Sequence, residues 1–226
     1  MKQSRARVRI YIEVGNTRTV ACALEWPGWC RSARNETAAV QALLTYGARY
    51  ARVIGSTELE FEPLSNESGF LVVERLKGNA TTDFGAPAVI LAADSEPLDG
   101  AEAERSQSIL RACWKAFDTL VVKATGKELQ KGPRGGGRDL KEIVQHVQDA
   151  ELAYLSRIGL KANADEPKGS SDHARQTVLD AVTEMAGVGK PEPGPRGGER
   201  WPMRYFVRRV AWHVLDHAWE IEDRII

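Results

Sequence analysis

One long amphipathic segment near the C-terminal end of the sequence constrains the fold more than any other. Between Arg200 and Ile226, apolar residues recur at the helical spacing of a single buried stripe: Met203, Phe206, Val207, Val210, Val214, Ala218, Ile221 and Ile225. His213 and His217 lie four residues apart just beside this stripe, so both side chains project from the same side of the predicted helix. Two such imidazoles can share a metal ion, but a complete site needs at least one further protein ligand.

Three more helical stripes precede this one, because the pattern is helical throughout from Ala101 onward. They cover Ile109–Ala124, Leu140–Ile158 and Ala174–Ala186. Four amphipathic helices in sequence predict a four-helix bundle over residues 101–226. Residues 77–100 are rich in glycine and proline and are expected to form a connector.

The first 76 residues show a different pattern. Residues 6–14 alternate as a half-buried strand does, and Thr19–Leu24 is expected to return beside them as a second strand. Asn35 is a good cap for a helix over residues 37–53, and two later apolar segments are the predicted sources of further strands, Phe61–Leu64 and Gly69–Leu76. The sequence therefore predicts an α+β protein, with a small α/β domain of β-β-α-β order before the helices.

A local motif in this first domain resembles the small α/β fold of HicB-like antitoxin domains. The likeness rests on Leu24-Glu25-Trp26-Pro27-Gly28-Trp29-Cys30, followed by Asn35-Glu36-Thr37-Ala38-Ala39 at the start of the helix. It covers about the first 55 residues. Arg34 stands where such domains often carry a glycine before the helix. A generic α/β segment with a Pro-Gly turn is the alternative interpretation.

Charge and cysteine usage narrow the functional classes. Lysine plus arginine equals aspartate plus glutamate, at 31 each, so no overall field favours nucleic acid or a membrane surface. The longest apolar runs are too short to span a bilayer, and the first residues carry no apolar core of a signal peptide. Cys22, Cys30 and Cys113 are odd in number and suggest no disulfide framework or thiolate zinc site. These features predict a reduced, cytoplasmic protein.

His146 is the candidate third ligand, and the helical rise tests whether it can reach the other two. At about 1.5 Å per residue, His146 lies roughly 18 Å from the end of its helix, whereas His213 and His217 lie roughly 16 and 22 Å from the start of theirs. His146 falls between them if the two helices run antiparallel. This favours an up-down-down-up order, which requires a crossover over Leu160–Ser171.

This arrangement resembles the DinB-like superfamily of metal-binding four-helix bundles. The matching motifs are His146-Val147-Gln148-Asp149-Ala150-Glu151-Leu152-Ala153-Tyr154-Leu155 and His213-Val214-Leu215-Asp216-His217, and the likeness covers roughly residues 100–226. The resemblance implies an up-down-down-up bundle, a divalent metal (zinc or nickel) on three histidines, and often a homodimer. Studied members include thiol-dependent isomerases and transferases. The alternative is that the three histidines form a hydrogen-bonded polar network without a metal.

Two carboxylates are candidate catalytic groups beside this centre. Glu220 lies three residues after His217 and is expected to point into the same region, as a general base or a partner of a ring N–H. Glu151 lies within the apolar stripe of its helix, where an unpaired charge is costly, so it needs a partner. Arg209 and Arg224 flank the histidines and could pair these acids or hold an anionic substrate.

A second apolar seam on the last helix concerns partners. Tyr205, Trp212 and Trp219 recur every seven residues, away from the main stripe. Such a seam is expected to be covered by the N-terminal domain or by a second copy of the chain in a homodimer.

Two functional hypotheses remain from the sequence. In the first, the protein is a metal-dependent transferase or hydrolase whose substrate is a small molecule, with a small thiol as a candidate. In the second, it is a non-catalytic binding or regulatory protein, with partner recognition by the N-terminal domain and a structural metal or none in the bundle. Three histidines accept zinc, nickel, iron or copper, so the sequence leaves the metal open.

Overall fold

Within the described residues, the strands and one long helix lie in one unit of the chain, and four long helices lie in the other. The computed structural model describes residues 7–131, 137–160, 171–194 and 197–226, and the chain divides into two compact units, Met1–Val89 and Ile90–Ile226. The predicted α+β class is confirmed, since a four-stranded sheet is combined with helices. The division between the units falls within the predicted connector, which carries α2 (Ala80–Asp83) and the short 3-10 helix η2 (Ala92–Ser95).

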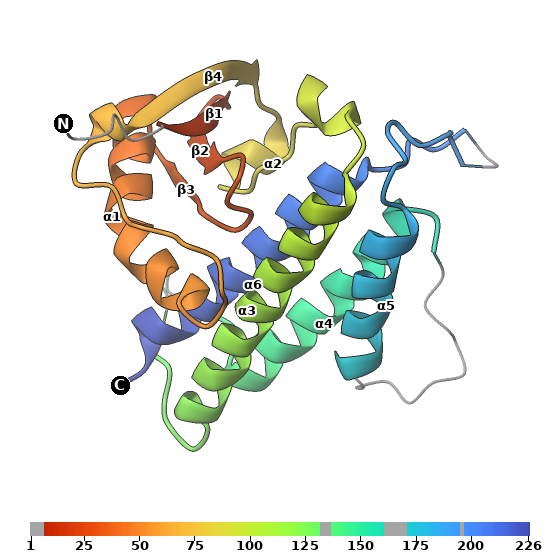
Figure 1. Cartoon of the computed structure of the whole chain (residues 1–226). Coiled ribbons are helices and arrows are strands. Elements are labelled where there is room, and N and C mark those ends of the chain that lie inside the picture. Colours follow the sequence, from red (N-terminus) through yellow and green to blue (C-terminus); the bar gives the residue numbers. More distant parts are fainter. Residues whose placement is uncertain (1–6, 132–136, 161–170, 195–196) are drawn as a thin grey trace. The chain divides into compact units, whose positions relative to one another are not determined.

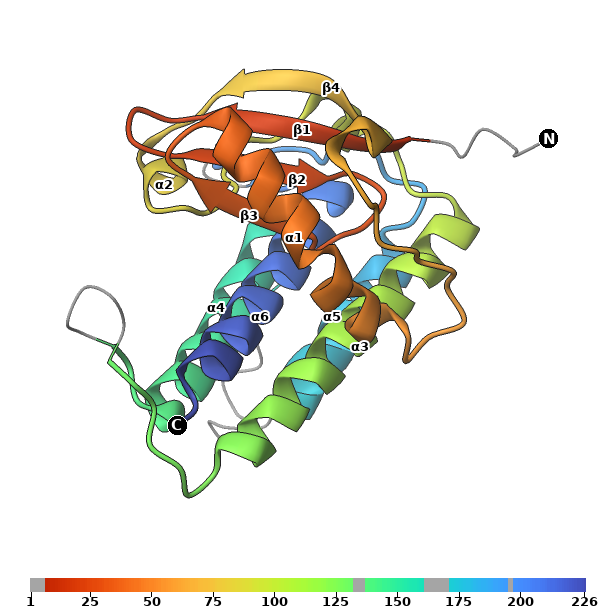
Figure 2. The ribbon, with the colours of Figure 1, turned by 90° about the vertical axis from the view of Figure 1, so that its left-hand side faces the viewer.

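The sheet of the first unit has the strand order β3-β2-β1-β4 (Figures 1 and 2). β1 pairs antiparallel with β2 and parallel with β4, and β2 pairs antiparallel with β3. A parallel partner needs a crossover, which α1 supplies by packing across β2 and β3. The bounds of these elements are β1 Val8–Val14, β2 Thr19–Ala23, β3 Cys30–Ala33, α1 Glu36–Ile54, the 3-10 helix η1 Glu67–Gly69, and β4 Phe70–Lys77.

An aromatic cluster forms the core between the sheet and α1. The Trp29 ring is fully buried and stacks on Tyr50 at 5.9 Å between ring centroids. The Trp29 Nε1–H donates to the Leu43 carbonyl at 2.8 Å, and the Tyr50 hydroxyl donates to the Pro27 carbonyl at 2.9 Å. Pro27 and Gly28 turn the chain before Trp29, and the φ of 93° at Gly28 requires the left-handed freedom of glycine. The Trp-Pro-Gly-Trp motif therefore has a structural role in this core.

Two strand predictions in this unit were wrong. β3 was not expected, because it has only four residues and three of them are half-exposed. Phe61–Leu64 was expected to form a strand but lies outside regular structure. The Phe61 ring instead packs edge-on against Trp29 at 5.0 Å, and Pro63 has no N–H with which to join a sheet. The order is therefore β-β-β-α-β.

The missed strand also overturns the prediction that the cysteines form no disulfide. Cys22 in β2 lies directly opposite Cys30 in β3, and the two are joined by a disulfide. Among the three cysteines, only Cys113 is a free thiol, and it is buried. Because two of the three cysteines form a disulfide, the cysteines no longer indicate a reducing compartment. The cytoplasmic location therefore stays a prediction.

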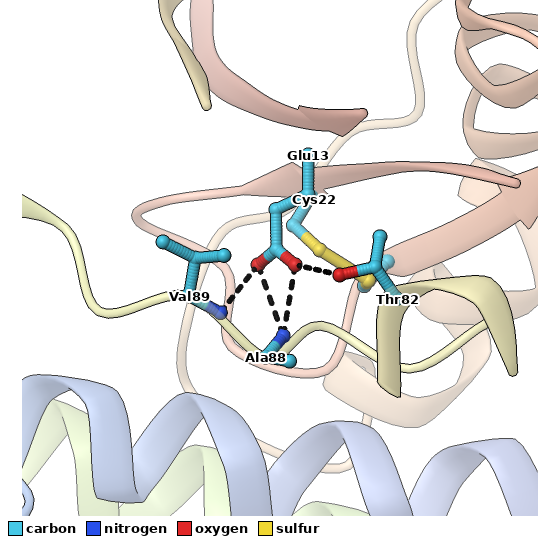
Figure 3. The surroundings of a disulfide bond; sticks show 6 residues. Glu13, Cys22, Thr82, Ala88 and Val89 are labelled. Carbon is cyan, nitrogen blue, oxygen red and sulfur yellow. Dashed lines mark hydrogen bonds between the residues drawn. A yellow bond between two sulfur atoms is a disulfide. The ribbon is translucent and has the colours of Figure 1, made fainter. Parts of the chain in front are cut away.

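The carboxylate of Glu13 lies close to Cys22 and binds the last residues of the first unit (Figure 3). Its side chain is fully buried, and its carboxylate accepts hydrogen bonds from α2 and from the segment that follows it. The backbone N–H groups of Ala88 and Val89 donate at 2.9 and 3.1 Å, and the hydroxyl of Thr82 donates at 3.2 Å. Because a buried carboxylate needs several donors, Glu13 holds the segment after α2 in place.

Four long helices make up the second unit, at the places where the sequence predicts them. Their bounds are α3 Gly100–Ala124, α4 Leu140–Arg157, α5 Ser171–Glu184 and α6 Met203–Arg224. The N-termini of α3 and α4 both carry a capping box, formed by Asp99 with Glu102 and by Asp139 with Glu142. Gly159, with a φ of 92°, follows the end of α4 in the left-handed conformation that favours glycine.

Contacts at the helix ends establish how α6 runs beside its neighbours. Arg204 at the start of α6 pairs with Glu102 at the start of α3, at 2.6 Å, so these two helices run in the same direction. The Tyr154 ring near the end of α4 lies 5.2 Å from that of Trp201, just before α6 begins. At the opposite end, Arg224 of α6 donates to the carbonyl of Arg138, just before α4. α4 and α6 therefore run antiparallel.

α5 packs on α3 and α4. Gln107 in the first half of α3 donates to the Leu179 carbonyl in the second half of α5, at 2.8 Å. Arg175 near the start of α5 forms a two-pronged ion pair with Asp118 in the second half of α3. α5 and α3 therefore run antiparallel. The predicted crossover over Leu160–Ser171 falls on residues 161–170, which lie outside the described part of the chain.

Two further sequence expectations concern the surface of the chain. None of the helices within the described ranges is both long enough and apolar enough to cross a membrane. On α6, the side chains of Tyr205, Trp212 and Trp219 are buried. The single chain therefore covers this seam by itself, so the expectation that a second copy covers it was wrong, and the homodimer stays a prediction.

The disulfide predicts a specific thiol count. Denatured protein that has never met a reductant should react with a thiol reagent at one cysteine, Cys113, whereas reduced protein should react at all three. The two paired cysteines are 8 residues apart in the sequence. A disulfide that closes so short a loop stabilises a fold by about 2–3 kcal/mol, so reduction should lower the free energy of unfolding by that amount. Thiol titration and urea unfolding check both points. Three reactive thiols before reduction would refute the pairing.

Candidate metal centre

Three histidines meet where α4 crosses the inner side of α6. α6 buries His213 and His217 to 6% and 9% exposure, and α4 brings His146 against them with its ring half-exposed. The His146 ring centroid lies 5.0 Å from that of His213 and 4.9 Å from that of His217. His146 is thus equally close to both, as the antiparallel arrangement predicts.

The nitrogens of this cluster are spaced as ligands of one ion would be. One ligand atom from each of the three histidines can be chosen so that all lie within 4.8 Å of one another. Nε2 of His213 and Nε2 of His146 are 3.2 Å apart. Two nitrogens bound to one ion at about 2.1 Å lie roughly 3.0–3.4 Å apart, so this pair already has the required separation. The cluster could therefore hold a metal ion.

The same contact has an alternative explanation, which the sequence also left open. Two neutral rings can share one hydrogen between their Nε2 atoms without a metal. However, Nδ1 of His213 is buried and has no hydrogen-bond partner among the described residues. If Nε2 binds a metal, Nδ1 carries the ring hydrogen and still lacks an acceptor, and in a metal-free network Nδ1 is unpartnered as well. This nitrogen therefore does not decide between the two explanations.

Burial keeps two of these rings neutral. It lowers the pKa of His213 to about 2, with further lowering by the neighbouring histidines and by Arg209 and Arg138. Burial, followed by the charge on His217, also lowers the pKa of His146. Neutral imidazole is the form that binds metals, because a protonated ring has no lone pair to donate. The site is therefore preset for ligation at neutral pH.

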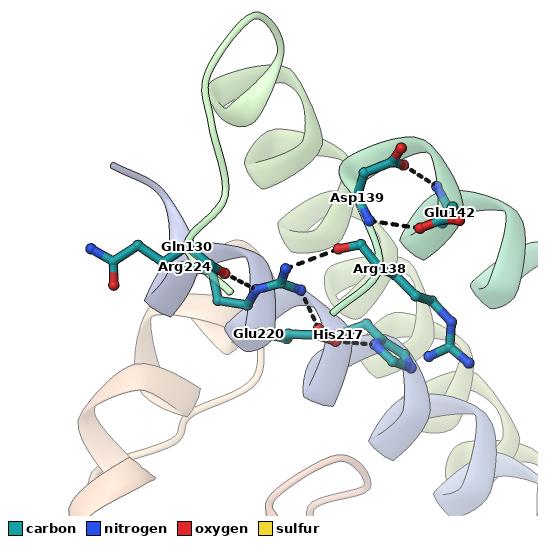
Figure 4. Close-up of polar contacts among 7 residues, drawn as sticks. All are labelled: Gln130, Arg138, Asp139, Glu142, His217, Glu220 and Arg224. Carbon is teal, nitrogen blue, oxygen red and sulfur yellow. Dashed lines mark hydrogen bonds and ion pairs between the residues drawn. The ribbon is translucent and has the colours of Figure 1, made fainter. Parts of the chain in front are cut away.

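Glu220 and Arg224 orient His217 in a chain of contacts (Figure 4). Nδ1 of His217 lies 2.7 Å from Oε2 of Glu220, which leaves Nε2 to face the other histidines. Oε1 of Glu220 accepts from Arg224 at 2.6 Å, and Arg224 also donates to the carbonyls of Gln130 and Arg138. The hydrogen bond from His217 is the largest cause that lowers the pKa of Glu220. Glu220 lies at the site, and a direct catalytic role for it stays a prediction.

Glu151 does not join the histidines. It is buried at 1% exposure, and its Oε1 accepts from the indole Nε1–H of Trp114 on α3 at 2.5 Å. Five residues along a helix correspond to roughly 140° of rotation, so Glu151 and His146 project from different sides of α4. Burial raises the pKa of Glu151 to about 7, although the charge on Arg175 opposes the shift. The predicted catalytic role at the metal site has no support from this position.

Two residues beside the histidines were not singled out from the sequence. The Tyr154 ring lies 5.7 Å from that of His213, and the Arg209 guanidinium lies 5.7 Å from the centroid of Tyr154. Tyr154 follows His146 by two helical turns, so its spacing could have indicated this position. Arg138 precedes the cap of α4, and no helical period could have placed its side chain. His173, the fourth histidine of the sequence, is exposed on α5 and lies outside the cluster.

Comparisons with known proteins do not assign the chain to a family. No family model, no curated protein and no solved structure matches it.

The burial of Glu151 predicts that ionisation of its carboxyl lowers the stability of the fold at high pH, and that a glutamine at this position avoids the loss. Because the pKa is raised in the folded state, the stability contribution of the protonated carboxyl is complete below about pH 4.5 and is lost as the pH rises through about 7. Glu151→Gln still accepts from Trp114 but cannot ionise. It should raise the free energy of unfolding by about 1–3 kcal/mol at pH 8 and have little effect at pH 4.5.

Urea unfolding at both pH values checks this, with the exposed Glu104→Gln on α3 as the matched control. The same change in stability at pH 4.5 and pH 8 would show that Glu151 does not hold a proton in the folded protein.

The contact between Glu220 and His217 predicts weaker metal binding when the carboxylate is removed. Glu220→Ala leaves His217 free to rotate and to adopt the wrong tautomer, so metal affinity should fall by about 10- to 100-fold. A competition titration against a coloured chelator measures the affinity. Asp223→Ala, an exposed carboxylate on the same helix, should leave it unchanged. Equal losses in the two variants would mean that only the charge of α6 matters.

Proposed function

We propose that residues 90–226 bind one divalent metal ion, zinc or nickel, through Nε2 of His146, His213 and His217. The observation that carries this proposal is the convergence of the three rings, with the 3.2 Å approach of the first two Nε2 atoms. The contact of Glu220 with Nδ1 of His217 supports it, because such a partner directs the opposite nitrogen towards a metal. The choice of zinc or nickel rests on the DinB-like resemblance alone.

We further propose that this unit is a DinB-like up-down-down-up four-helix bundle. The support comes from pairs of helices: α3 and α6 run in the same direction, whereas α4 is antiparallel to α6 and α5 is antiparallel to α3. This order brings His146 level with the two histidines of α6. A homodimer and a HicB-like role for the first unit remain proposals that rest on resemblance.

The proposed activity is that of a metal-dependent transferase or hydrolase that acts on a small molecule, with a small thiol as one reactant. Within the described ranges, no fourth histidine, cysteine or carboxylate joins the three ligands, and three protein ligands are typical of catalytic rather than structural centres. A divalent ion held there would act as a Lewis acid and lower the pKa of a water or thiol beside it.

The chain's own residues would prepare the site for this chemistry. His146 is half-exposed, which gives a ligand access from solvent. His213 and His217 are held on a buried helix side, and Glu220 keeps the His217 ring in one orientation. The Tyr154 ring covers the flank of His213 and limits the approach of water from that side.

Elemental analysis of purified protein tests the proposal. The wild-type chain should carry about one metal ion, whereas His213→Ala should lose most of it, because two remaining imidazoles bind far more weakly. His173→Ala is the matched control, since it also removes an imidazole from the second unit but from an exposed position. Equal metal content in the three proteins would refute the metal site and the metal-dependent reaction proposed for it.

A further inference from the structure

The end of α6 pairs with a segment that precedes it by more than ninety residues. Residues 128–130, which follow α3, meet it through an isolated antiparallel bridge between Leu129 and Ile225. Beside this bridge, the N–H of Gln130 donates to the carbonyl of Arg224 at 2.7 Å. This pairing and the side-chain contacts of Arg224 together form a clamp between the end of α6 and the segments before α4.

The guanidinium of Arg224 extends the clamp to the histidine site (Figure 4). Its three nitrogens bind three different acceptors: Nε donates to the carbonyl of Gln130 at 2.7 Å, Nη2 to that of Arg138 at 2.9 Å, and Nη1 to Oε1 of Glu220 at 2.6 Å. Because a guanidinium is planar and rigid, the two carbonyls fix where Nη1 lies. The clamp therefore holds Glu220, whose other oxygen meets Nδ1 of His217.

Gly137 lies against this guanidinium and leaves the space that it occupies. A Cβ at Gly137 would come within 2.6 Å of Nη2 and 3.1 Å of Cζ of Arg224. Contacts this short force a shift of one group or the other. Arg224 is only 9% exposed and is bound at all three nitrogens. A methyl group at Gly137 must therefore weaken at least one of the hydrogen bonds that lead to the histidines.

We propose that the clamp sets the metal affinity of the three-histidine site, and that Gly137 is a positioning residue of that site although it is not a ligand. The inference rests on the proposed function, because it takes the histidines as metal ligands. When the clamp is open, Glu220 loses its anchor, and His217 loses the partner that directs its Nε2 towards the other rings. Because such coupling is reciprocal, metal binding also stabilises the closed clamp.

The zinc affinity of two glycine variants tests the steric step. Gly137→Ala should lower the affinity by about ten-fold, the lower end of the loss that is typical for partners of a metal-bound histidine. Gly100→Ala is the matched control and should bind zinc as the wild type does, because a Cβ at Gly100 meets nothing within 4 Å. Competition with a coloured chelator measures the affinity, and circular dichroism checks that both variants are folded.

A double variant shows whether Gly137 acts through Arg224. Arg224→Gln removes the guanidinium and should itself lower zinc affinity by about ten-fold or more. A methyl group at Gly137 then has no guanidinium to displace, so Gly137→Ala combined with Arg224→Gln should bind zinc no more weakly than Arg224→Gln alone. Additive losses would refute the route from Gly137 through Arg224 to the histidines.

The tautomer of His217 in the metal-free protein gives a second, independent readout. The closed clamp places the ring hydrogen on Nδ1, where it faces Glu220. Nitrogen-15 NMR at pH 8.5 distinguishes this tautomer from the Nε2–H form by its chemical shifts. The wild type and Gly100→Ala should show the Nδ1–H form, whereas Gly137→Ala and Arg224→Gln should shift towards a mixture of the two. A glycine needed only for folding would leave the tautomer unchanged.

The two readouts distinguish failure of this inference from failure of the proposed function. If the wild-type protein binds zinc but Gly137→Ala matches it in affinity and tautomer, the clamp is refuted while the metal centre stands. If the wild-type protein takes up no zinc, the centre and its dependence on the clamp are both refuted. The tautomer of His217 then shows separately whether the clamp orients that ring.

Discussion

The antiparallel packing of α4 against α6 is the constraint on which the candidate centre depends. It brings His146 to nearly equal distances from His213 and His217. Both ends of the pair are tied, by the contact of Tyr154 with Trp201 and by the bond from Arg224 to the carbonyl before α4. A slip of one helical turn, about 5.4 Å, would carry His146 past one of its partners. The end contacts therefore matter to the site as much as the histidines themselves.

The main features of the helical unit could be predicted because helical geometry is fixed. A constant rise and rotation per residue set the heights of the three histidines once the helix directions were assumed. The same periodicity correctly placed Glu151 in the buried stripe of α4. The periodicity does not predict which neighbouring helix packs against the stripe at Glu151. Glu151 faces Trp114 on α3 rather than the histidines on α6, because α4 packs against both helices.

The features that escaped prediction lie where no periodic pattern operates. β3 is short and polar, so it gave no alternation, and without it Cys22 and Cys30 could not be recognised as neighbours. The apolar pattern predicts a strand at Phe61, whereas its ring completes the aromatic cluster around Trp29. Arg138 lies just before the cap of α4, where its carbonyl accepts a hydrogen bond from Arg224. Each of these positions is determined by contacts between residues distant in the sequence.

The ligand environment of the bound ion offers the most direct test of the central claim, that three imidazoles converge on one metal. X-ray absorption spectroscopy of the protein loaded with one equivalent of zinc measures that environment. Convergence of the three imidazoles predicts a first shell that includes three imidazole nitrogens at about 2.0–2.1 Å, falling to two in a His146→Ala variant. A shell of oxygen atoms alone, or one unchanged by that substitution, would contradict it.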